Sequence, residues 1–218
     1  MIAVPRSGYV SLQALQILEH LADGAFHSGQ QLAEQLGVTR AAVWKQVGVL
    51  TELGLPVERV RGKGYRIAGG VELLDEVAIM AALSANSRSL VEELTVFPKI
   101  DSTNAELARC PKPAHGARVA LAEYQSAGRG RRGRRWISPF GSSIYCSVAW
   151  TFQGGAESLQ GLSLAVGVCL CDALEALGVT GLTLKWPNDV LCDDSKLAGI
   201  LVEMSGDASG PCTAIIGM

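Results

Sequence analysis

Glycine and arginine alternate over a short stretch near the middle of the chain, GRGRRGRRW at residues 128–136. Glycine lets a backbone approach a ligand closely, and arginine guanidinium groups bind phosphate and carboxylate oxygens through paired hydrogen bonds. The stretch has almost no apolar side chains before Trp136, so we expect a loop that stays mobile until an anion neutralises it. It is not a P-loop, which needs a Lys-Ser/Thr pair at the start of a helix.

Two other interpretations of this stretch stay open on the residues alone, an RNA-binding arginine tract and a solvated surface loop. RNA-binding tracts usually lie in terminal or low-complexity tails, whereas this one connects two strand-like segments. The residues therefore favour a small ligand that contains phosphate.

Three other polar clusters stand at predicted ends of strands. Residues 101–104 (DSTN) lie at a strand-to-helix junction, where hydroxyls and exposed N–H groups can receive a polar ligand. Residues 185–189 (KWPND) end a strand and expose one amide and one carboxylate, and Lys196 opens the apolar strand 197–201. Singly, these clusters are equally typical of a helix cap, a turn and a hairpin-edge lysine. Together they indicate one site.

The elements that must position these clusters alternate between strands and helices from residue 94 onward. The pattern predicts helices at 72–83, 103–110 and 159–177. It predicts strands at 95–100, 119–124, 143–150, 182–186, 197–204 and 213–216. This mixture favours an α+β or α/β layer over an all-helical domain.

The first 68 residues have a different pattern, typical of a winged helix. Apolar spacing predicts helices at 10–23, 28–36 and 39–50, with Ser28 and Thr39 as N-caps. After residue 54 the period changes to two, and Gly62–Gly64 turns a basic β-hairpin. Two short helices joined by a glycine-containing turn form the helix-turn-helix pattern.

The face of the third helix opposite its buried stripe is a candidate DNA-binding surface. Such a helix can enter a major groove, while a basic wing contacts phosphates. The candidates are Thr39, Arg40, Ala41, Trp44, Lys45, Arg61 and Lys63. The alternative is a solvated helix face in a protein-interaction domain. A single module makes few phosphate contacts, so useful affinity requires a dimer on two half-sites.

The composition favours a globular cytoplasmic protein. The net charge is −2 and 48% of residues are hydrophobic, and the first residues show no secretory signal pattern. Asp172 and Glu175 interrupt the apolar stretch 162–179, which predicts a buried core helix and not a membrane span. The six cysteines form no C-x-x-C pair and lack zinc-ligand spacing to histidine, so we expect buried, reduced thiols and no protein-bound metal.

Four strings in this order resemble the catalytic domain of biotin–protein ligases: DSTN, YQSAGRGRRGRRW, KWPND and KLAGILVE. HSGQQLAEQLGVTRAAVWKQVGVL and the RGKGYRI wing resemble the DNA-binding domain of the family's bifunctional members, which also repress the biotin operon. The resemblance implies an α+β fold with three parts: a winged helix-turn-helix at 1–68, a linker and connecting helix at 69–82, and a mixed α/β catalytic domain of the biotin/lipoate ligase type at 83–218. Related chains continue past the 213–216 strand into a small β-barrel-like domain, so we expect the C-terminal part to be missing here.

The resemblance also implies a two-step reaction. ATP and biotin, with Mg²⁺, give biotinoyl-5′-adenylate, and a lysine of a biotin carboxyl carrier protein then takes the biotinoyl group. Motif positions assign catalytic roles to Arg131, Lys196 and Asp189. They assign biotin binding to Ser102, Thr103, Asn104, Gln125, Gly128, Arg129, Gly130, Arg131, Lys196 and Gly199. They assign nucleotide binding to Arg131, Arg132, Arg134, Trp136 and Asn188.

The implied partners are the carrier protein, operator DNA and a second copy of the chain in a ligand-dependent homodimer, with no membrane. Two competing hypotheses are a lipoate ligase, which shares the catalytic fold, and a transcription factor whose second domain only senses a ligand. Transfer of labelled biotin or lipoate to a carrier domain distinguishes the three.

Overall fold

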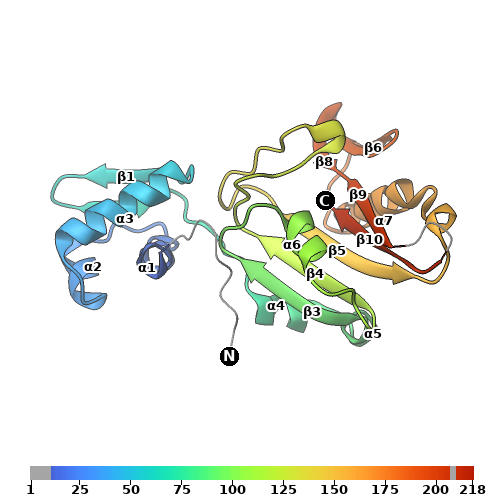
Figure 1. The fold of residues 1–218 in the computed structure, drawn as a ribbon. Helices are drawn as coiled ribbons and strands as arrows, with labels where there is room; N and C mark the ends of the chain where they lie inside the picture. Colours follow the sequence, from blue (N-terminus) through green and yellow to red (C-terminus); the bar gives the residue numbers. More distant parts are fainter. Residues whose placement is uncertain (1–10, 207–209) are drawn as a thin grey trace.

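The computed structural model describes residues 11–206 and 210–218, which form a smaller N-terminal body beside a larger α/β body (Figure 1). The smaller body has three helices and a two-stranded antiparallel sheet: α1 (Leu12–Leu21), α2 (Gly29–Gln35), α3 (Arg40–Glu52), β1 (Val57–Val60) and β2 (Gly64–Ile67). This is the predicted winged helix. Residue 10, the first of the predicted helix 10–23, lies outside the described residues.

Each helix of the smaller body begins at a hydroxyl cap. The Ser11, Ser28 and Thr39 side chains accept hydrogen bonds from backbone N–H groups of the first turns of α1, α2 and α3. Ser28 forms a complete capping box with Gln31. The two predicted caps, Ser28 and Thr39, are therefore confirmed.

The core of the smaller body is made by one stripe from each helix. Val43, Val47 and Leu50 of α3 are fully buried, as the spacing predicted, against apolar residues of α1 and α2. The wing joins this core through Ile67. Gly64 begins β2 with φ +107°, and a Cβ there would collide with the His27 carbonyl group, so the wing can approach the start of α2 only with glycine at this position.

The larger body is built on a five-stranded sheet in the order β3-β4-β5-β10-β9. Strands β3 and β4 are parallel and the other neighbours are antiparallel. The strands are β3 (Val91–Phe97), β4 (Ala117–Ala122), β5 (Tyr145–Phe152), β9 (Leu201–Gly206) and β10 (Cys212–Gly217). A second, antiparallel sheet contains β6 (Leu182–Lys185), β7 (Asp189–Cys192) and β8 (Ser195–Gly199).

The helical elements of the larger body are α4 (Glu76–Ala82), α5 (Ala85–Ser89), α6 (Thr103–Arg109) and α7 (Leu162–Ala176), with short 3-10 turns η1 (Arg131–Gly133) and η2 (Ala156–Leu159). Helix α6 packs on β4, β5 and β10, and α7 packs on β6, β7 and β9. The mixed α/β body predicted from the alternating pattern is confirmed.

The structure differs from the sequence predictions in three places. The predicted strand 197–204 is two strands, β8 and β9, which break at Ile200, where the backbone N–H donates to the Asn188 carbonyl at 2.8 Å. Strand β7 was not predicted, because the two aspartates after it mark a turn and its four residues are too few to show a period. Helix α5 was missed because its five residues, an alanine and four polar side chains, carry no apolar spacing.

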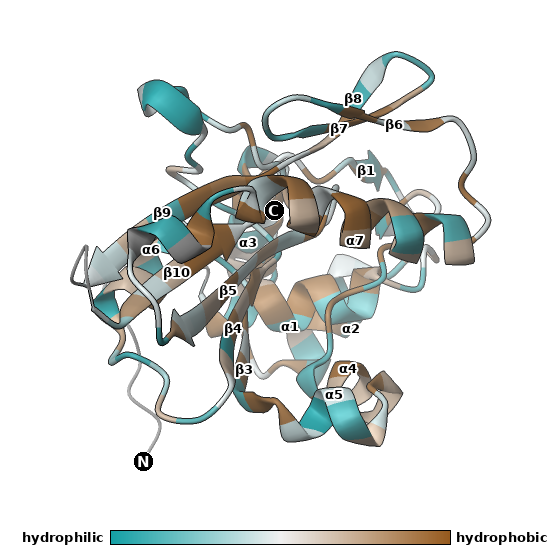
Figure 2. Ribbon diagram, turned by 90° about the vertical axis from the view of Figure 1, so that its right-hand side faces the viewer, coloured by the Kyte–Doolittle hydropathy of each residue, from teal (hydrophilic) through white to brown (hydrophobic). Residues whose placement is uncertain are grey.

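The prediction that 162–179 forms a buried core helix is wrong. Only Gly167 of α7 is buried, and Val168 is 48% exposed. Leu162, Val166 and Leu170 cover the sheet, while the remaining faces of this apolar helix are turned outward (Figure 2). No helix among the described residues is long and apolar enough to cross a membrane.

The cysteine predictions are partly wrong as well. All six cysteines are unpaired, as expected, but Cys169 on α7 is exposed, Cys212 is fully buried, and the other four, Cys146 among them, are partly buried. Burial raises the pKa of the Cys146 thiol to about 11, which keeps it protonated and unreactive. Within residues 11–206 and 210–218, no three His, Cys, Asp or Glu side chains gather as a metal site.

The segment that follows the arginine stretch connects the two bodies. Phe140 is 3% exposed and belongs to the core cluster of the winged helix, and its N–H donates to the Leu53 carbonyl at 3.4 Å. Nearby, the buried Glu123 carboxylate accepts the Leu74 N–H at 2.6 Å. The chain between the two bodies is thus fixed to the end of β4.

Candidate functional site

One cavity of about 440 Å³ gathers the polar clusters that the sequence singled out. Its walls come from the start of α6, the 125–136 loop, the turn between β6 and β7, and the junction of β8 with β9. The predicted residues that line it are Ser102, Thr103, Asn104, Gln125, Arg129, Gly130, Arg131, Arg132, Arg134, Trp136, Asn188, Asp189, Lys196 and Gly199. Gly128 lines an adjoining hollow under the same loop.

The deep end of the cavity is polar and already hydrogen-bonded. Ser102, Thr103 and Asn104 are at most 4% exposed. The Gln125 side-chain oxygen accepts the Thr103 backbone N–H at 2.9 Å, and the Gln125 amide donates to the Ser138 hydroxyl at 3.1 Å. Such a preorganised floor suits a ligand head that has both donors and acceptors.

Sequence reasoning missed Ser147, which supports this floor from below. Ser147 lies in the middle of β5 and is completely buried, and its hydroxyl oxygen lies 2.7 Å from Thr103 Oγ1 and 2.6 Å from Asn104 Oδ1. The sequence signal that could have identified Ser147 is a small polar residue at an inward-facing position of a strand whose residues alternate in burial. A buried hydroxyl needs a partner, and this one finds two on α6.

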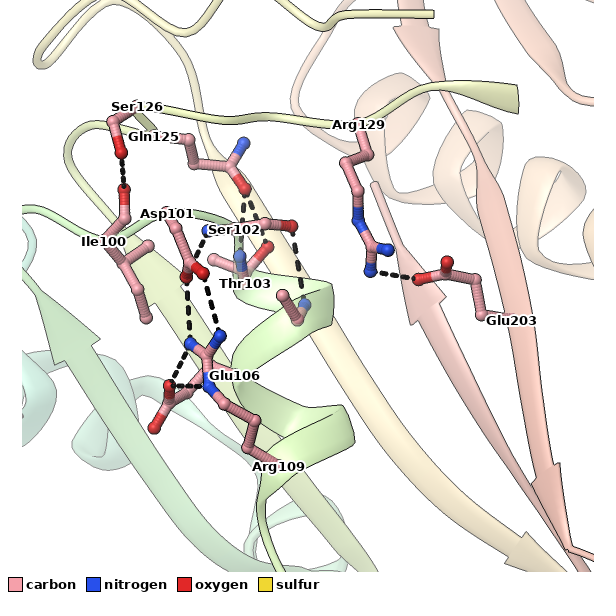
Figure 3. A network of polar contacts seen from close by, with 11 residues as sticks. Ile100, Asp101, Ser102, Thr103, Glu106, Arg109, Gln125, Ser126, Arg129 and Glu203 are labelled. Atoms are coloured by element: carbon pink, nitrogen blue, oxygen red, sulfur yellow. Dashed lines mark hydrogen bonds and ion pairs between the residues drawn. The ribbon is translucent and has the colours of Figure 1, made fainter. Parts of the chain in front are cut away.

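Outside the cavity, an ion-pair cluster holds the first turn of α6 (Figure 3). Asp101 accepts two hydrogen bonds from Arg109, at 2.8 and 2.9 Å, and its other contact is the Ser102 N–H at 2.7 Å. The Arg109 hydrogen bonds are the main reason that the pKa of the Asp101 carboxyl lies below its ordinary value. Asp101 therefore acts on the cavity through the backbone of Ser102.

The arginine stretch folds as a tight loop. The Gly130 N–H donates to the Arg134 carbonyl at 2.7 Å, and Arg132 and Gly133 have φ of +57° and +71°. At Gly128, a Cβ would lie 2.7 Å from the Trp136 carbonyl oxygen, so the two arms of the loop can approach only with glycine there.

Two arginines of the loop make side-chain contacts, one across the cavity and one across the adjoining hollow. Arg131 Nη1 donates to Asn188 Oδ1 at 3.0 Å, and Arg129 Nη2 lies 2.8 Å from Glu203 Oε2. Glu203 was not among the predicted site residues. The Asn188 contact connects the loop to the turn between β6 and β7, and the Glu203 contact connects it to β9.

The opposite wall carries a lysine, a carboxylate and an indole ring. Lys196 Nζ lies 2.7 Å from Asp189 Oδ1 and 5.1 Å from the centre of the Trp136 ring. A Cβ on Gly199 would lie 3.1 Å from that ring and 3.2 Å from Lys196 Cε. The five arginines of the loop and Lys196 face one carboxylate, Asp189, in the cavity wall. The site therefore favours an anionic ligand.

The predicted DNA-binding residues of the winged helix all lie at its surface. Those on α3 and the wing are exposed, and Trp44 is 60% exposed. A hollow between α3 and the wing includes Arg40, Trp44, Arg59 and Arg61. Arg59, which was not among the candidates, stacks over the Trp44 ring with its guanidinium carbon 6.0 Å from the ring centre. Lys63 lies over the Phe26 ring at 5.7 Å.

Comparison with known proteins agrees with this two-part arrangement. Residues 96–217 match the biotin/lipoate A/B protein ligase family, and residues 13–66 match an HTH domain. The bifunctional ligase/repressor BirA of Salmonella typhimurium is 42% identical over 203 residues, which cover 93% of this chain and 62% of that protein. BirA of Bacillus spizizenii is 33% identical over 199 residues, 90% of this chain and 60% of that protein.

A solved structure of a biotin protein ligase from Aquifex aeolicus in complex with biotin and ATP aligns with 58% of this chain and 52% of that chain, at 30% identity and a TM-score of 0.47. The chain spans about three fifths of the length of the curated relatives it matches. The ligase family match covers more than half of the sequence and contains every residue that lines the cavity except Met218. The chain therefore belongs to the biotin/lipoate A/B protein ligase family, with a helix-turn-helix domain in front of the ligase region.

Proposed function

We propose that this protein activates biotin with ATP and transfers it to a lysine of a biotin carboxyl carrier protein. The observation that carries the proposal is the single cavity in which a buried polar floor, the arginine loop and Lys196 converge. Each part suits one part of the reaction. The floor receives the uncharged ureido head of biotin, and the cationic wall receives its carboxylate together with the phosphates of ATP.

In the first step, a biotin carboxylate oxygen attacks the α-phosphorus of ATP and pyrophosphate leaves. Both reactants are anions, so the attack requires neutralisation of charge. Arg131 and Lys196 supply it, with Arg129, Arg132 and Arg134 nearby. Trp136 packs against the adenine and Asn188 hydrogen-bonds it. Mg²⁺ enters with ATP as part of the substrate.

In the second step, the acceptor lysine amine attacks the acyl carbon of the mixed anhydride and AMP leaves. The Asp189 carboxylate, which lies 2.7 Å from Lys196 Nζ, orients the incoming amine. Water would hydrolyse the anhydride before transfer, so the loop must cover it. The family also includes lipoate ligases, and the chemistry of lipoate activation is the same.

The test is to incubate the purified protein with MgATP, a carrier domain and either labelled biotin or labelled lipoate. We expect covalent label on the carrier from biotin only. Label from lipoate would assign the site to the other substrate. A protein that forms no adenylate and transfers neither label would refute the ligase proposal.

We also propose that the winged helix binds operator DNA as a dimer whose formation depends on the adenylate. Two bodies in contact through Phe140 give the ligand loop a physical route to the DNA-binding surface, since Phe140 lies only a few residues beyond that loop. The exposed basic face of α3 and the wing supports contact with phosphates and bases.

Gel-shift titration checks this second half. Biotin plus ATP should increase the affinity for operator DNA, whereas either compound alone should have less effect. An affinity that is unchanged by both ligands together would remove the repressor role and leave the ligase proposal intact.

A further inference from the structure

Glu203 is the residue where three separate parts of the site meet, although it entered the sequence analysis only as the last residue of the KLAGILVE string and was given no role. It lies on β9, and its Oε2 atom accepts a hydrogen bond from Arg129 Nη2 at 2.8 Å (Figure 3). The same oxygen accepts a second hydrogen bond from Asn104 Nδ2, also at 2.8 Å. One carboxylate oxygen thus joins the arginine loop to the first turn of α6.

The Asn104 side chain is fixed from both ends. Its Nδ2 group donates to Glu203, and its Oδ1 atom lies 2.6 Å from the Ser147 hydroxyl. Asn104 is 3% exposed. The Glu203 contact determines the orientation of the amide, because a carboxylate only accepts hydrogen bonds and a reversed amide would place an oxygen against it, whereas the Ser147 hydroxyl can either donate or accept.

Glu203 also lies among the positive charges of the arginine loop. Five arginines and Glu203 line the hollow under the loop, and Glu203 carries the one carboxylate among its described lining residues. Of the described ion pairs, only that between Arg129 and Glu203 includes a loop arginine. Both side chains are partly exposed, 44% for Arg129 and 35% for Glu203. Such a pair is weak enough for an anionic ligand to compete with it.

We infer that Glu203 is a positioning residue of the ligand site. Through Arg129 it holds the ligand-free arginine loop against β9, and through Asn104 it orients the polar floor. The consequence for biotin affinity rests on the proposed function, but the hold on the loop does not.

Trypsin is a direct probe, because it cleaves after arginine and the loop contains five. The measurement is the rate of cleavage after Arg134 and Arg135 in the ligand-free protein, followed by mass spectrometry. Glu203→Gln keeps an oxygen for Asn104 and removes the charge that holds Arg129. We expect cleavage to become about three- to fivefold faster, the loss expected for one partly exposed ion pair.

Salt distinguishes this role from a general loosening of the fold. Added NaCl should accelerate loop cleavage in the wild type and have little effect on E203Q, whose ion pair is already absent. Glu58→Gln is the matched control, since Glu58 forms a cross-strand ion pair of similar exposure with Arg66 in the wing. It should leave cleavage of the loop unchanged.

Arg129→Gln provides a second route to the same result. Cleavage after Arg134 and Arg135 should be as fast in R129Q as in E203Q. The double variant should be cleaved no faster than either single variant. Equal cleavage rates in wild type, E203Q and R129Q would overturn the inference. If E203Q fails to fold, R129Q alone decides between these outcomes.

Biotin binding then tests the site itself. Glu203→Ala removes the acceptor of Asn104 as well as the charge, so it should bind biotin about tenfold more weakly than E203Q, the effect of leaving the Asn104 amide without its charge-assisted partner. If the loop is released in E203Q but the wild-type protein binds no biotin, the role of Glu203 in holding the loop stands and the proposed function is refuted. Equal biotin affinities in E203A and E203Q would overturn the role in the floor.

Discussion

Arg131 is the loop residue whose position argues most directly for a role in holding the activated intermediate. Its guanidinium group lies 3.0 Å from Asn188 Oδ1 and faces the same cavity as Lys196. Its partner in the ligand-free protein is a neutral amide. The whole of its charge is therefore available to a ligand.

Replacing this residue gives the first prediction. Arg131→Gly should accelerate dissociation of biotinoyl-5′-AMP by about 10- to 100-fold, the loss of one charge-assisted hydrogen bond. Stopped-flow or filter-binding release of the labelled adenylate measures it. Lys112→Ala, which removes a surface charge outside the cavity, should retain the wild-type rate. An R131G variant that holds the adenylate as tightly as wild type would refute the role.

A buried carboxyl group at the junction of the two bodies gives a prediction about pH. Burial raises the pKa of Glu123 above its ordinary value of 4.5, although the hydrogen bond from Leu74 acts in the opposite direction. The folded state therefore favours the protonated form, so the contribution of Glu123 to stability is greatest below pH 4.5 and is lost as pH rises through the raised pKa.

Glu123→Gln keeps the acceptor for Leu74 without the buried charge. The melting temperature of E123Q should match wild type near pH 4 and exceed it increasingly as pH rises. Glu92→Gln should behave in the opposite way, because hydrogen bonds from His115 and Ala114 lower the pKa of Glu92 and stabilise its charged form. An E123Q curve parallel to wild type at all pH values would contradict this account.

The wing is the element whose shape depends most on one residue. Gly64 has φ +107°, which side chains rarely adopt, and its missing side chain leaves space for the His27 carbonyl group. The backbone pairs of His27 with Tyr65 at 2.9 Å in both directions then attach the wing to the start of α2. This geometry places Arg61 at the hollow beside α3 and Lys63 over the Phe26 ring.

Gly64→Ala should therefore destabilise the winged helix by about 1–3 kcal/mol and weaken DNA binding, while adenylate formation persists. Thermal melting and gel shift measure the two effects. Gly62→Asn is the control for stability, since Gly62 also has positive φ but has open space around it, and asparagine tolerates that conformation. If the melting temperature and the DNA affinity of G64A equal those of wild type, the close approach to His27 contributes neither to stability nor to DNA binding.

At the scale of the molecule, the two bodies share a side chain. Phe140 belongs to the chain segment that continues from the ligand loop, yet it is buried in the core of the winged helix. Phe140 thus joins the segment after the loop to the core of the winged helix. The coupling of ligase and repressor proposed above needs such a contact between the two bodies.

Truncating this side chain tests the connection. Phe140→Ala should reduce stability by about 3 kcal/mol and increase proteolysis of residues 68–75, which link the bodies. Ile137→Ala, three residues earlier and 79% exposed in wild type, should do neither. Biotin plus ATP should alter operator affinity less in F140A than in wild type, and an unchanged ligand effect would show that the coupling does not pass through this contact.

Local patterns alone determined much of this architecture. Hydroxyl caps at Ser28 and Thr39 and the buried stripe of α3 were predictable because helix ends and amphipathic faces depend on residues within a few positions. The polar clusters were visible for the same reason, as were the strands with clear apolar runs. The roles proposed for those clusters came from the resemblance and await experiment.

Only the tertiary structure decided which distant residues meet. Ser147 under Asn104, Glu203 against Arg129, and Phe140 in the other body are pairings between residues 43 to 87 positions apart, and no local period specifies them. Helix α7 shows the converse, since its apolar sequence predicted burial although only one side has the sheet to cover it. A sequence states how apolar an element is, whereas the packing of its neighbours decides how much of it is buried.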